Sequence, residues 1–512
     1  MRELETRFQR QCRESHNKTM YVLTRKMMAE AEALADKSGQ SYFHLMQNAG
    51  TGAAEFILKT VEVCGKRVVC LCGSGNNGGD GFIIADRLCQ EGAKVTVVLT
   101  HQKPSTLIAQ KAFSLLGEGV SVTEDASAIG DADIIVDAIF GTGLSREPDE
   151  RICDIFEAVN NSGATVFSVD IPSGIEADTG RVLSCAIKAD YTIALSSYKY
   201  CHIVPRGIMY CGETTVLDIG IDDRIIEGFK GKIKVIERPT TKKRERVSHK
   251  GSYGTGVSVT GSYGMPGASI ISGKAALRSG LGILKIATVK ENYTACAAAL
   301  PEAVLIPLES DGTTMIYENI SLLKRELQRA SAILIGCGLG VSEDVKKITR
   351  ELICSAEVPI IIDADGINNI AGDIEFIKQV KAPIIMTPHP AEMSRLCGKT
   401  VAEIEDNRIE IATEFAMKYR VYLCLKGTNT VIATPKGEVF INVIGNAGMA
   451  TGGSGDMLAG IILGLVARGE AVLDAVCAAV WLHSAAGDAA RDELGETSML
   501  PSDMIERLHR FF

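Results

Sequence analysis

The last quarter of the chain places a carboxylate directly after a glycine-rich loop. The loop reads Asn446-Ala-Gly-Met-Ala-Thr-Gly-Gly-Ser-Gly-Asp456, and the apolar run Met457–Ala467 follows it as a predicted buried helix. Glycines before a helix leave backbone amides free to bind an anion. Asp456, in the first helical turn, could accept a proton from a hydroxyl that is being phosphorylated. A plain N-terminal cap is the alternative role, and the glycines favour catalysis.

Three glycine-bearing turns in the first half follow predicted strands. They are Gly73-Ser-Gly-Asn-Asn-Gly-Gly-Asp-Gly81, Val136-Asp-Ala-Ile-Phe-Gly-Thr-Gly-Leu144 and Val169-Asp-Ile-Pro-Ser-Gly174. Each turn alone could merely cap its strand. Since the carboxyl ends of parallel strands meet at one crevice, we expect one site that contains Asn76, Asn77, Asp80, Asp137, Asp170 and Ser173.

The first of these turns also matches a dinucleotide-binding fingerprint through Gly73, Gly75 and Gly78. That fingerprint requires an acidic residue about 20 positions later, at the end of the second strand. The strand predicted over Lys94–Thr100 is followed instead by His101. The sequence therefore argues against a hydride-transferring dehydrogenase.

The elements that must position these residues alternate between short β-branched runs and helical runs. Two opening helices are predicted over Thr24–Lys37 and Ser41–Lys59, and a later helix begins at Phe82. The predicted strands are Val68–Cys72, Lys94–Thr100, Ile134–Ile139, Thr165–Val169, Val257–Thr260, Leu284–Thr288, Ala332–Ile335, Pro359–Ile362, Ile384–Thr387 and Tyr422–Lys426. This alternation predicts α/β folds with parallel sheets.

The length and one charged segment predict two domains. A chain of 512 residues exceeds the roughly 250 to 300 residues of a single core. Residues 237–246 carry no apolar side chain, which is typical of a domain boundary. We therefore expect a leader at 1–20, a first domain at 21–236, a linker at 237–245 that buries nothing, and a second domain at 246–512.

Composition excludes several classes of protein. A formal charge of −9 and one short basic cluster, Lys242–Arg246, provide no surface for nucleic acid, and no apolar run is long enough to span a membrane. Fifteen cysteines lack a regular framework, so we expect no disulfides and a cytoplasmic, reducing location. Cys70 and Cys72 are interpreted as core thiols rather than metal ligands. We also expect a homo-oligomer.

The N-terminal motifs, together with Leu45-Met-Gln-Asn-Ala-Gly50, resemble the NAD(P)H-hydrate epimerase domain over residues 20–235. The family often has Glu at Gln47, and we expect little consequence. The resemblance implies a Rossmann-like three-layer fold, a potassium ion bound by Asn77, Asp137 and Ser173, and Asp170 as a catalytic carboxylate in contact with substrate. It further implies hydrate binding by Asn76, Asn77, Gly78, Gly79, Asp80, Gly141, Thr142, Gly143, Leu144, Ser145, Arg146, Glu147 and Asp170.

Further pieces near predicted strand ends of the second half resemble the ribokinase-like ADP- or ATP-dependent NAD(P)H-hydrate dehydratase. They are His249–Gly254, Gly264–Ala268, Gly336–Gly340, Asp363–Gly366, Thr387–Glu392 and Leu425–Thr428. The resemblance implies that the hydrate is contacted by Ala268, Gly338, His389 and Asp456. It places ADP or ATP, with Mg²⁺, on Lys426, Gly427, Thr428, Asn429, Thr430 and Gly455. Ala391 replaces a common glycine, which is tolerated unless that backbone needs a positive φ.

Together the two resemblances imply repair of the hydrated coenzymes NADHX and NADPHX, with epimerisation in the first domain and nucleotide-dependent dehydration in the second. The alternative is a ribokinase-like kinase for a vitamin precursor, fused to a non-catalytic nucleotide-binding module. A stable phosphorylated product would favour that kinase. The intact Asn77, Asp80, Asp137 and Asp170 argue against a non-catalytic first half.

Overall fold

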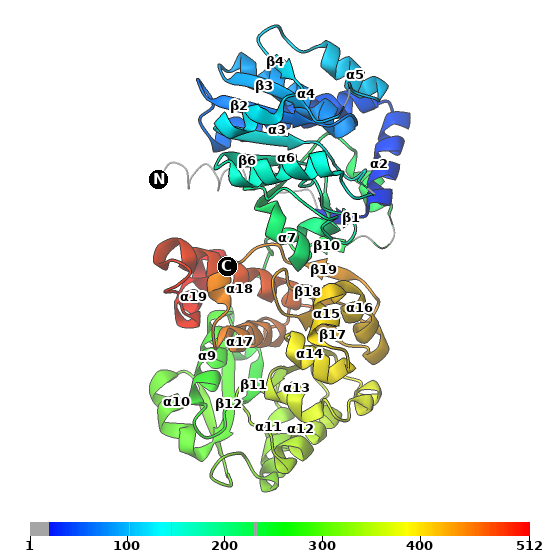
Figure 1. Ribbon diagram of the computed structural model, residues 1–512. Coiled ribbons are helices and arrows are strands. Elements are labelled where there is room, and N and C mark those ends of the chain that lie inside the picture. The colour runs from blue at the N-terminus through cyan, green and yellow to red at the C-terminus, as the bar shows by residue number, and fades with distance from the viewer. Residues whose placement is uncertain (1–19, 102, 145, 230, 232) are drawn as a thin grey trace. The chain divides into compact units, whose positions relative to one another are not determined.

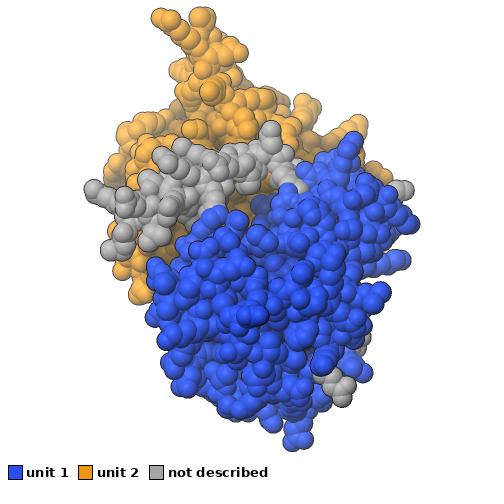
Figure 2. All heavy atoms as spheres, turned by 90° about the horizontal axis from the view of Figure 1, so that it is seen from above, with its two compact units in different colours: residues 1–234 blue, residues 235–512 orange. Residues whose placement is uncertain are grey.

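The computed structural model describes residues 20–512 except 102, 145, 230 and 232. The chain divides into two compact units, residues 1–234 and residues 235–512 (Figure 2). The predicted leader, apart from Met20, lies outside the described residues. None of the described helices combines the length and the apolar character needed to span a bilayer.

The first unit contains ten strands and seven α-helices among its described residues, β10 crossing the division between the units. The strands are β1 (Tyr21–Leu23), β2 (Arg67–Cys72), β3 (Lys94–Leu99), β4 (Ser121–Thr123), β5 (Ile134–Ala138), β6 (Thr165–Val169), β7 (Tyr191–Leu195), β8 (Tyr198–Lys199), β9 (Glu213–Leu217) and β10 (Ile233–Val235). The helices are α2 (Arg25–Lys37), α3 (Tyr42–Thr60), α4 (Asn76–Gln90), α5 (Leu107–Ser114), α6 (Glu150–Asn161), α7 (Pro205–Cys211) and α8 (Asp223–Glu227).

A seven-stranded parallel sheet forms the centre of this unit, in the order β4-β3-β2-β5-β6-β7-β9. Successive strand residues point to opposite faces, so Cys70 packs with α3 and α4, whereas Leu71 packs with α6. Helices therefore cover both faces (Figure 1), and the predicted Rossmann-like three-layer fold is confirmed. The buried Cys70 and Cys72 are core thiols, as expected.

The order of strands creates a natural binding crevice. The chain runs outward from β2 to β3 and β4, then returns to form β5 on the other side of β2. At such a switch point the loops after the two central strands diverge to opposite faces and leave a crevice between them. The loops that start at Gly73 and Ile139 follow these two strands, so they lie at this crevice.

Helix α4 begins at Asn76, six residues before the predicted start at Phe82. Four of its first six residues are Gly78, Gly79, Asp80 and Gly81, whose low helix propensity hides the helix in the sequence. Both asparagines of the motif therefore occupy the first helical turn rather than a loop.

The second unit contains nine further strands and eleven α-helices. The strands are β11 (Thr255–Val259), β12 (Ile283–Val289), β13 (Val304–Leu308), β14 (Ala332–Ile335), β15 (Ile360–Ile362), β16 (Ile384–Met386), β17 (Tyr422–Leu425), β18 (Val431–Ala433) and β19 (Val439–Ile441). The helices are α9 (Pro266–Arg278), α10 (Tyr293–Ala299), α11 (Ile320–Leu327), α12 (Glu343–Ser355), α13 (Asp365–Ile370), α14 (Pro390–Cys397), α15 (Val401–Asp406), α16 (Arg408–Tyr419), α17 (Ser454–Ala467), α18 (Val472–Leu494) and α19 (Pro501–Arg507).

The sheet of this unit runs β13-β12-β11-β14-β15-β16-β17-β18-β19. Pairs from β13 to β17 are parallel, and β18 and β19 add antiparallel strands at one side. The buried helix α17 packs with α9, α18 and α19 in the main core. The switch point lies between β11 and β14, so the loops after the parallel strands meet at one edge.

The predicted linker is not free of the second unit. The Lys242 backbone N–H donates to Glu470 Oε1 at 3.0 Å, and Arg468 Nη2 donates to the Lys242 carbonyl at 2.6 Å. Arg244 Nη2 donates to the Gly280 carbonyl at 2.9 Å. No residue of 237–245 is buried, but the backbone and charged side chains of this segment bond to helix ends of the second unit.

One disulfide joins Cys153 of α6 to Cys185, 32 positions later, with Cα atoms 5.8 Å apart. The expectation of no disulfide is wrong for this pair. Sequence spacing hid it, because the chain after β6 turns back over α6 and brings the two cysteines together. Most other cysteines of the described residues are free.

Candidate functional site

Two glycines of the first unit's loop, Gly73 and Gly78, are packed too tightly to carry a side chain. A Cβ at Gly78 would lie 1.9 Å from the Gly73 carbonyl oxygen, and one at Gly73 would lie 2.1 Å from the Ile139 carbonyl oxygen. These contacts hold the start of α4 against the loop after β5. Asn76 accepts a hydrogen bond from Thr106 Oγ1 at 2.7 Å, and the Asn77 amide nitrogen is buried without a partner among the described residues.

Asp137, at the end of β5, is fully buried and accepts several hydrogen bonds. Its Oδ1 lies 2.6 Å from Ser173 Oγ, and its Oδ2 accepts from the Ser173 N–H and from Ser168 Oγ, both at 2.8 Å. Burial raises the pKa of Asp137, and the bonds from Ser173 and Ser168 oppose that rise. Asp137 and Ser173 are thus in direct contact, as their predicted shared role requires.

The loop after β5 places Gly141, the first residue of the predicted hydrate-binding loop 141–147, beside Asn77 and Asp170. A Cβ at Gly141 would lie 3.2 Å from Asp170 Oδ2 and 3.4 Å from Asn77 Cγ. The three turns predicted to share one site therefore do so at these positions. Thr142 and Leu144 are half-buried, whereas Gly143, Arg146 and Glu147 are exposed, and Ser145 lies outside the described residues.

Asp170 follows β6 in a strained backbone conformation and is held by a lysine. Its φ of 68° is in the left-handed region, which is uncommon outside glycine and costs of order 1–3 kcal/mol. Lys199 Nζ lies 2.5 Å from Asp170 Oδ1 and 2.7 Å from the Leu195 carbonyl oxygen. The Lys199 side chain is 1% exposed, so this ion pair is shielded from water.

Lys199 and its neighbours Glu32 and His202 are not among the predicted site residues. The only signal in the sequence is that Lys199 and His202 follow a short β-branched run, and neither has a recognisable motif. Burial, followed by the charge of Asp170, raises the pKa of both Asp80 and Glu32 above the ordinary carboxylate range. Burial, followed by the charge of Lys199, lowers the pKa of His202 to about 3.

In the second unit, Asp456 is the third residue of α17, one turn from the glycine loop. Gly453 precedes the helix with φ of 91°, a conformation that favours glycine. Burial, followed by the charge of Asp363, raises the pKa of Asp456. The ligand atoms of Cys337, Asp363 and Asp456 lie within 4.8 Å of one another, so three loops converge here.

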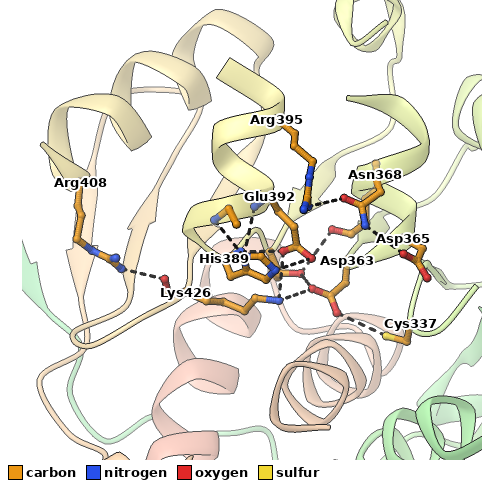
Figure 3. A network of polar contacts seen from close by, with 12 residues as sticks. Cys337, Asp363, Asp365, Asn368, His389, Glu392, Arg395, Arg408 and Lys426 are labelled. Carbon is orange, nitrogen blue, oxygen red and sulfur yellow. Dashed lines mark hydrogen bonds and ion pairs between the residues drawn. The ribbon is translucent and has the colours of Figure 1, made fainter. Parts of the chain in front are cut away.

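Figure 3 shows a network of polar contacts that includes Asp363, Glu392 and Lys426. Lys426 Nζ donates to Asp363 Oδ1 at 2.7 Å and lies 3.9 Å from Glu392 Oε2. Although burial disfavours the charged ammonium, the two carboxylates raise the pKa of Lys426. Asp363 also accepts from Thr387 Oγ1 at 2.7 Å. Lys426 is therefore a fixed positive charge at the carboxyl end of β17.

His389 forms the N-terminal cap of α14 and belongs to the same network. The His389 ring Nδ1 accepts hydrogen bonds from the backbone amides of Ala391 and Glu392 at 3.1 and 3.3 Å. The backbone N–H of His389 donates to Glu392 Oε2 at 2.8 Å. The imidazole is 48% exposed, and its Nε2 lies 3.4 Å from Glu392 Oε1. Ala391 does not adopt a positive φ, so the departure from the family pattern is tolerated.

The two small residues predicted to contact the hydrate lie against each other. A Cβ at Gly338, whose φ is 59°, would approach Ala268 Cβ to 2.8 Å. Ala268 sits in the first turn of α9, which follows β11, and Gly338 follows β14. These are the two strands of the switch point, so both residues line the same crevice.

The predicted nucleotide loop at 426–430 is supported by an arginine that the sequence analysis missed. Arg408 is buried, and its Nη2 donates to the carbonyls of Leu425 and Lys426 at 3.0 and 3.1 Å. Gly427 lies directly on this guanidinium, and Thr430 Oγ1 donates to its carbonyl at 3.2 Å. Thr428 is exposed, and Asn429 has φ of 54°.

Gly455 connects the nucleotide loop to the helix that carries Asp456. A Cβ at Gly455 would lie 3.2 Å from Lys426 Nζ, so the first turn of α17 faces the lysine. The N–H groups of a first helical turn have no partner within the helix and attract anions. Lys426 and this helix end can therefore hold a phosphate between them.

One segment that was predicted to belong to the second unit's site lies away from it. The segment His249–Gly254 precedes β11, and a Cβ at Gly254 would lie 1.8 Å from the Ala467 carbonyl oxygen at the far end of α17. Fourteen helical residues span about 21 Å, so this segment is remote from Asp456. Its glycines serve close packing at the opposite edge of the sheet.

Comparisons with known proteins cover both units. A family model described as NAD(P)H-hydrate dehydratase matches residues 257–510, and one described as YjeF-related protein N-terminus matches residues 43–201. One similar solved structure is that of the Bacillus subtilis ADP/ATP-dependent NAD(P)H-hydrate dehydratase, co-crystallized with ATP/Mg²⁺. The two sequences are 34% identical, and the matched region covers 52% of this chain and 92% of the Bacillus subtilis chain, with a TM-score of 0.46. The predicted ribokinase-like α/β class of the second unit is confirmed.

Two curated relatives match nearly the whole chain. The bifunctional NAD(P)H-hydrate repair enzyme of Thermofilum pendens is 36% identical over 93% of this chain and 92% of its own length. The bifunctional NAD(P)H-hydrate repair enzyme of Escherichia coli is 33% identical over 94% of this chain and 91% of its own length. This chain therefore belongs to the family of bifunctional NAD(P)H-hydrate repair enzymes.

Proposed function

We propose that this chain repairs NADHX and NADPHX in two steps, one in each unit. The observation that carries the proposal is that each unit has its own crevice at a topological switch point, with a carboxylate at its centre. Asp170 occupies the first crevice and Asp456 the second. Membership of the repair family over nearly the full length supports both activities.

The second unit would dehydrate the S form at the expense of ADP or ATP. In the hydrate, water has added across C5 and C6 of the ring, and hydroxide is a poor leaving group. Asp456 accepts the hydroxyl proton while the oxygen attacks the terminal phosphoryl group, which the amides at Gly452–Gly455 and the Lys426 ammonium stabilise. Phosphate and the C5 proton then leave, which restores the coenzyme.

The nucleotide fits the charges of this crevice. Its phosphates would lie between Lys426 and the start of α17, and its remaining parts along residues 427–430. Magnesium would be held chiefly by the phosphate oxygens, where it neutralises charge that develops during transfer. Ala268, Gly338 and His389 would position the hydrate on the other side of Asp456.

The first unit would interconvert the R and S forms, with hydrate bound by Asn76–Asp80 and by the loop 141–147. A potassium ion fits beside it, because Asp137 Oδ1, Ser173 Oγ and the Phe140 carbonyl lie together and all are hard oxygen donors. The Asn77 amide, whose buried Nδ2 has no partner among the described residues, completes the donor set. The ion would hold the two loops in register.

The test is an assay of the full chain with mixed R- and S-hydrate and either ADP or ATP, followed by the recovery of reduced-nicotinamide absorbance. Complete recovery of both epimers is expected. A stable phosphorylated product without recovery would instead identify a kinase for another small molecule.

We further propose that residues 20–234 and 235–512 are separable domains. The division lies slightly before the expected linker, because residues 237–245 bond to the second unit. A cytoplasmic location fits substrates that arise from coenzymes and a chain in which most described cysteines are free. The expected homo-oligomer stays a prediction, which light scattering of the purified chain tests.

A further inference from the structure

A buried arginine lies beneath the predicted nucleotide loop of the second unit. Arg408 is the first residue of α16, and only 4% of its side chain is exposed. Its Nη2 donates to two backbone carbonyls, those of Leu425 at 3.0 Å and Lys426 at 3.1 Å. These carbonyls belong to the end of β17 and the start of the loop. Because an arginine is rarely buried without partners, the place of its partners indicates its role.

The loop turns directly over the guanidinium. Gly427 has φ of 142°, and a Cβ there would lie 2.8 Å from Arg408 Nη1 and 2.9 Å from Nη2. No side chain fits in that space, so the glycine allows the backbone to lie against the arginine. Thr430 Oγ1 closes the loop by donating to the Gly427 carbonyl at 3.2 Å. Arg408 therefore fixes three consecutive residues, 425–427, by two hydrogen bonds and one packing contact.

The arginine is itself held by a carboxylate three positions earlier in the chain. Arg408 Nη1 lies 3.1 Å from Glu405 Oε1 and 3.2 Å from Glu405 Oε2. A guanidinium has five donors in one plane, so it can bond a carboxylate and two carbonyls at once. The carbonyls carry no net charge that needs to be neutralised. The bonds to them therefore serve to fix the backbone of the loop.

The same arginine fixes the backbone of the lysine that we place at the phosphates. The Lys426 carbonyl accepts from Arg408, and the Lys426 backbone N–H donates to the Pro388 carbonyl at 2.9 Å. The ammonium of Lys426 is held separately, by Asp363 at 2.7 Å. Loss of Arg408 would thus loosen the loop 427–430 and leave the ammonium on its carboxylate. Nucleotide binding should suffer more than the phosphoryl transfer itself.

We propose that Arg408 is a positioning residue for ADP or ATP, which holds the loop 426–430 in its binding conformation before the nucleotide arrives. This inference rests on the proposed nucleotide-dependent dehydration. A loop that is already ordered loses little conformational entropy on binding, so its support raises affinity without a contact to the ligand. Arg408 acts through the backbone of residues 425–427 and touches neither the nucleotide nor the hydrate.

A second buried arginine of the same unit provides a matched control. Arg468 is 8% exposed, donates to two backbone carbonyls at 3.1 and 2.6 Å, and pairs with Glu470 at 3.0 Å. A Cβ at Gly280 would lie 2.7 Å from Arg468 Nη1, so a glycine lies against this guanidinium as well. Arg468 follows the last residue of α17, a helix about 21 Å long, whereas Lys426 faces the start of that helix. The two arginines thus make the same kinds of bond, one at the nucleotide loop and one far from it.

The experiment measures binding of ADP and of ATP, each with Mg²⁺, to the full chain by titration calorimetry without hydrate. Arg408→Met removes every donor, and Arg408→Lys keeps the charge without the planar set of donors. If the unsupported loop holds its binding conformation for about a tenth of the time, the Kd rises about tenfold in Arg408→Met. Arg408→Lys should bind more tightly than Arg408→Met and more weakly than wild type. Arg468→Met and Arg468→Lys should bind the nucleotides as wild type does.

Steady-state dehydration of S-hydrate by the same variants separates positioning from a general loss of structure. Partial unfolding lowers the amount of active enzyme and therefore kcat, whereas a displaced loop raises KM for the nucleotide. For both Arg408 variants we expect a higher KM for the nucleotide. Their kcat at saturating nucleotide and their KM for the hydrate should stay close to wild type.

Two results would overturn the inference. One is a wild-type Kd and KM for the nucleotide in both Arg408 variants, and the other is an equal rise of these values in the Arg468 variants. If Arg408→Met does not fold, Arg408→Lys alone decides between these outcomes. If the wild-type chain neither binds ADP or ATP nor uses them to dehydrate the hydrate, the proposed function fails instead.

Discussion

The two crevices both pair a lysine with an aspartate that directly follows a strand, yet they use the pair differently. Lys199 bonds to Asp170 at 2.5 Å in the first unit, and Lys426 bonds to Asp363 at 2.7 Å in the second. In the first unit the paired aspartate is itself the proposed catalytic carboxylate. In the second the paired aspartate holds the lysine for phosphate, and the base is a separate carboxylate.

The separate base has a different environment. Asp456 sits at a helix N-terminus, where burial with the charge of Asp363 raises its pKa and the charge of Lys426 opposes that rise. A raised pKa makes a carboxylate a stronger base for a hydroxyl proton.

The largest effect is expected from Asp456→Asn, which removes the proton acceptor and keeps its shape. Nucleotide-dependent dehydration should fall by about 10² to 10⁴-fold, as for a general base. Epimerisation without nucleotide should be unchanged, because Asp456 belongs to the other unit. Dehydration within threefold of wild type would refute the assigned role and with it the contrast between the two lysine–aspartate pairs.

Asp137→Ala should have the next largest effect, confined to the first unit. Loss of the carboxylate should weaken the response of epimerisation to potassium and leave dehydration intact. Ser168→Ala is the matched control, because it removes a hydrogen bond to Asp137 but keeps the carboxylate. If titration with potassium gave the same curve for Asp137→Ala and wild type, the proposed ion site would be wrong.

Gly455→Ala should have a smaller effect on the second unit. The added methyl would lie 3.2 Å from Lys426 Nζ, where we place a phosphate, so KM for the nucleotide should rise several-fold with the fold preserved. Gly372→Ala, which meets nothing within 4 Å, is the control. An unchanged KM for Gly455→Ala would place the phosphates elsewhere.

The smallest effect concerns stability. The pKa of Asp456 is raised in the folded chain above its ordinary value of 3.8. The folded chain therefore loses stability as the pH rises from 3.8 through the raised pKa of the folded state. Asp456→Asn removes this cost at neutral pH, so its second unit should unfold at a slightly higher temperature than wild type. Thermal unfolding at several pH values checks this, and the difference should shrink as the pH falls. A variant that is less stable at neutral pH would contradict it.

The sequence predicted most strands because β-branched runs bounded by glycine are distinctive. The run Ala332–Ile335 matches β14 in full, and the opening helices differ from α2 by one residue at its start and from α3 by one residue at each end. Motifs at strand ends located both crevices, since parallel topology brings those ends together. The start of α4 was missed because glycine has a low helix propensity. In the fold, the close packing that these glycines allow outweighs that propensity.

Buried charges could not be predicted in the same way. Lys199 and Arg408 belong to residue types that are almost always exposed, and their partners are 29 and 17 or more positions away. Only the folded sheet shows that the end of β8 reaches Asp170, or that α16 places a guanidinium under the loop at Gly427. Pairing across the fold, rather than local pattern, decides these contacts.

The division of labour between the units is tested most directly by complementation between two full-length variants. Asp170→Asn should consume S-hydrate with ADP or ATP and then stall on R-hydrate, beyond its slow spontaneous conversion, because only its first crevice is impaired. Adding Asp456→Asn, which can epimerise but not dehydrate, should remove the stall and restore recovery of all the coenzyme. Rapid consumption of both epimers by Asp170→Asn alone, or a stall that Asp456→Asn does not relieve, would contradict the account.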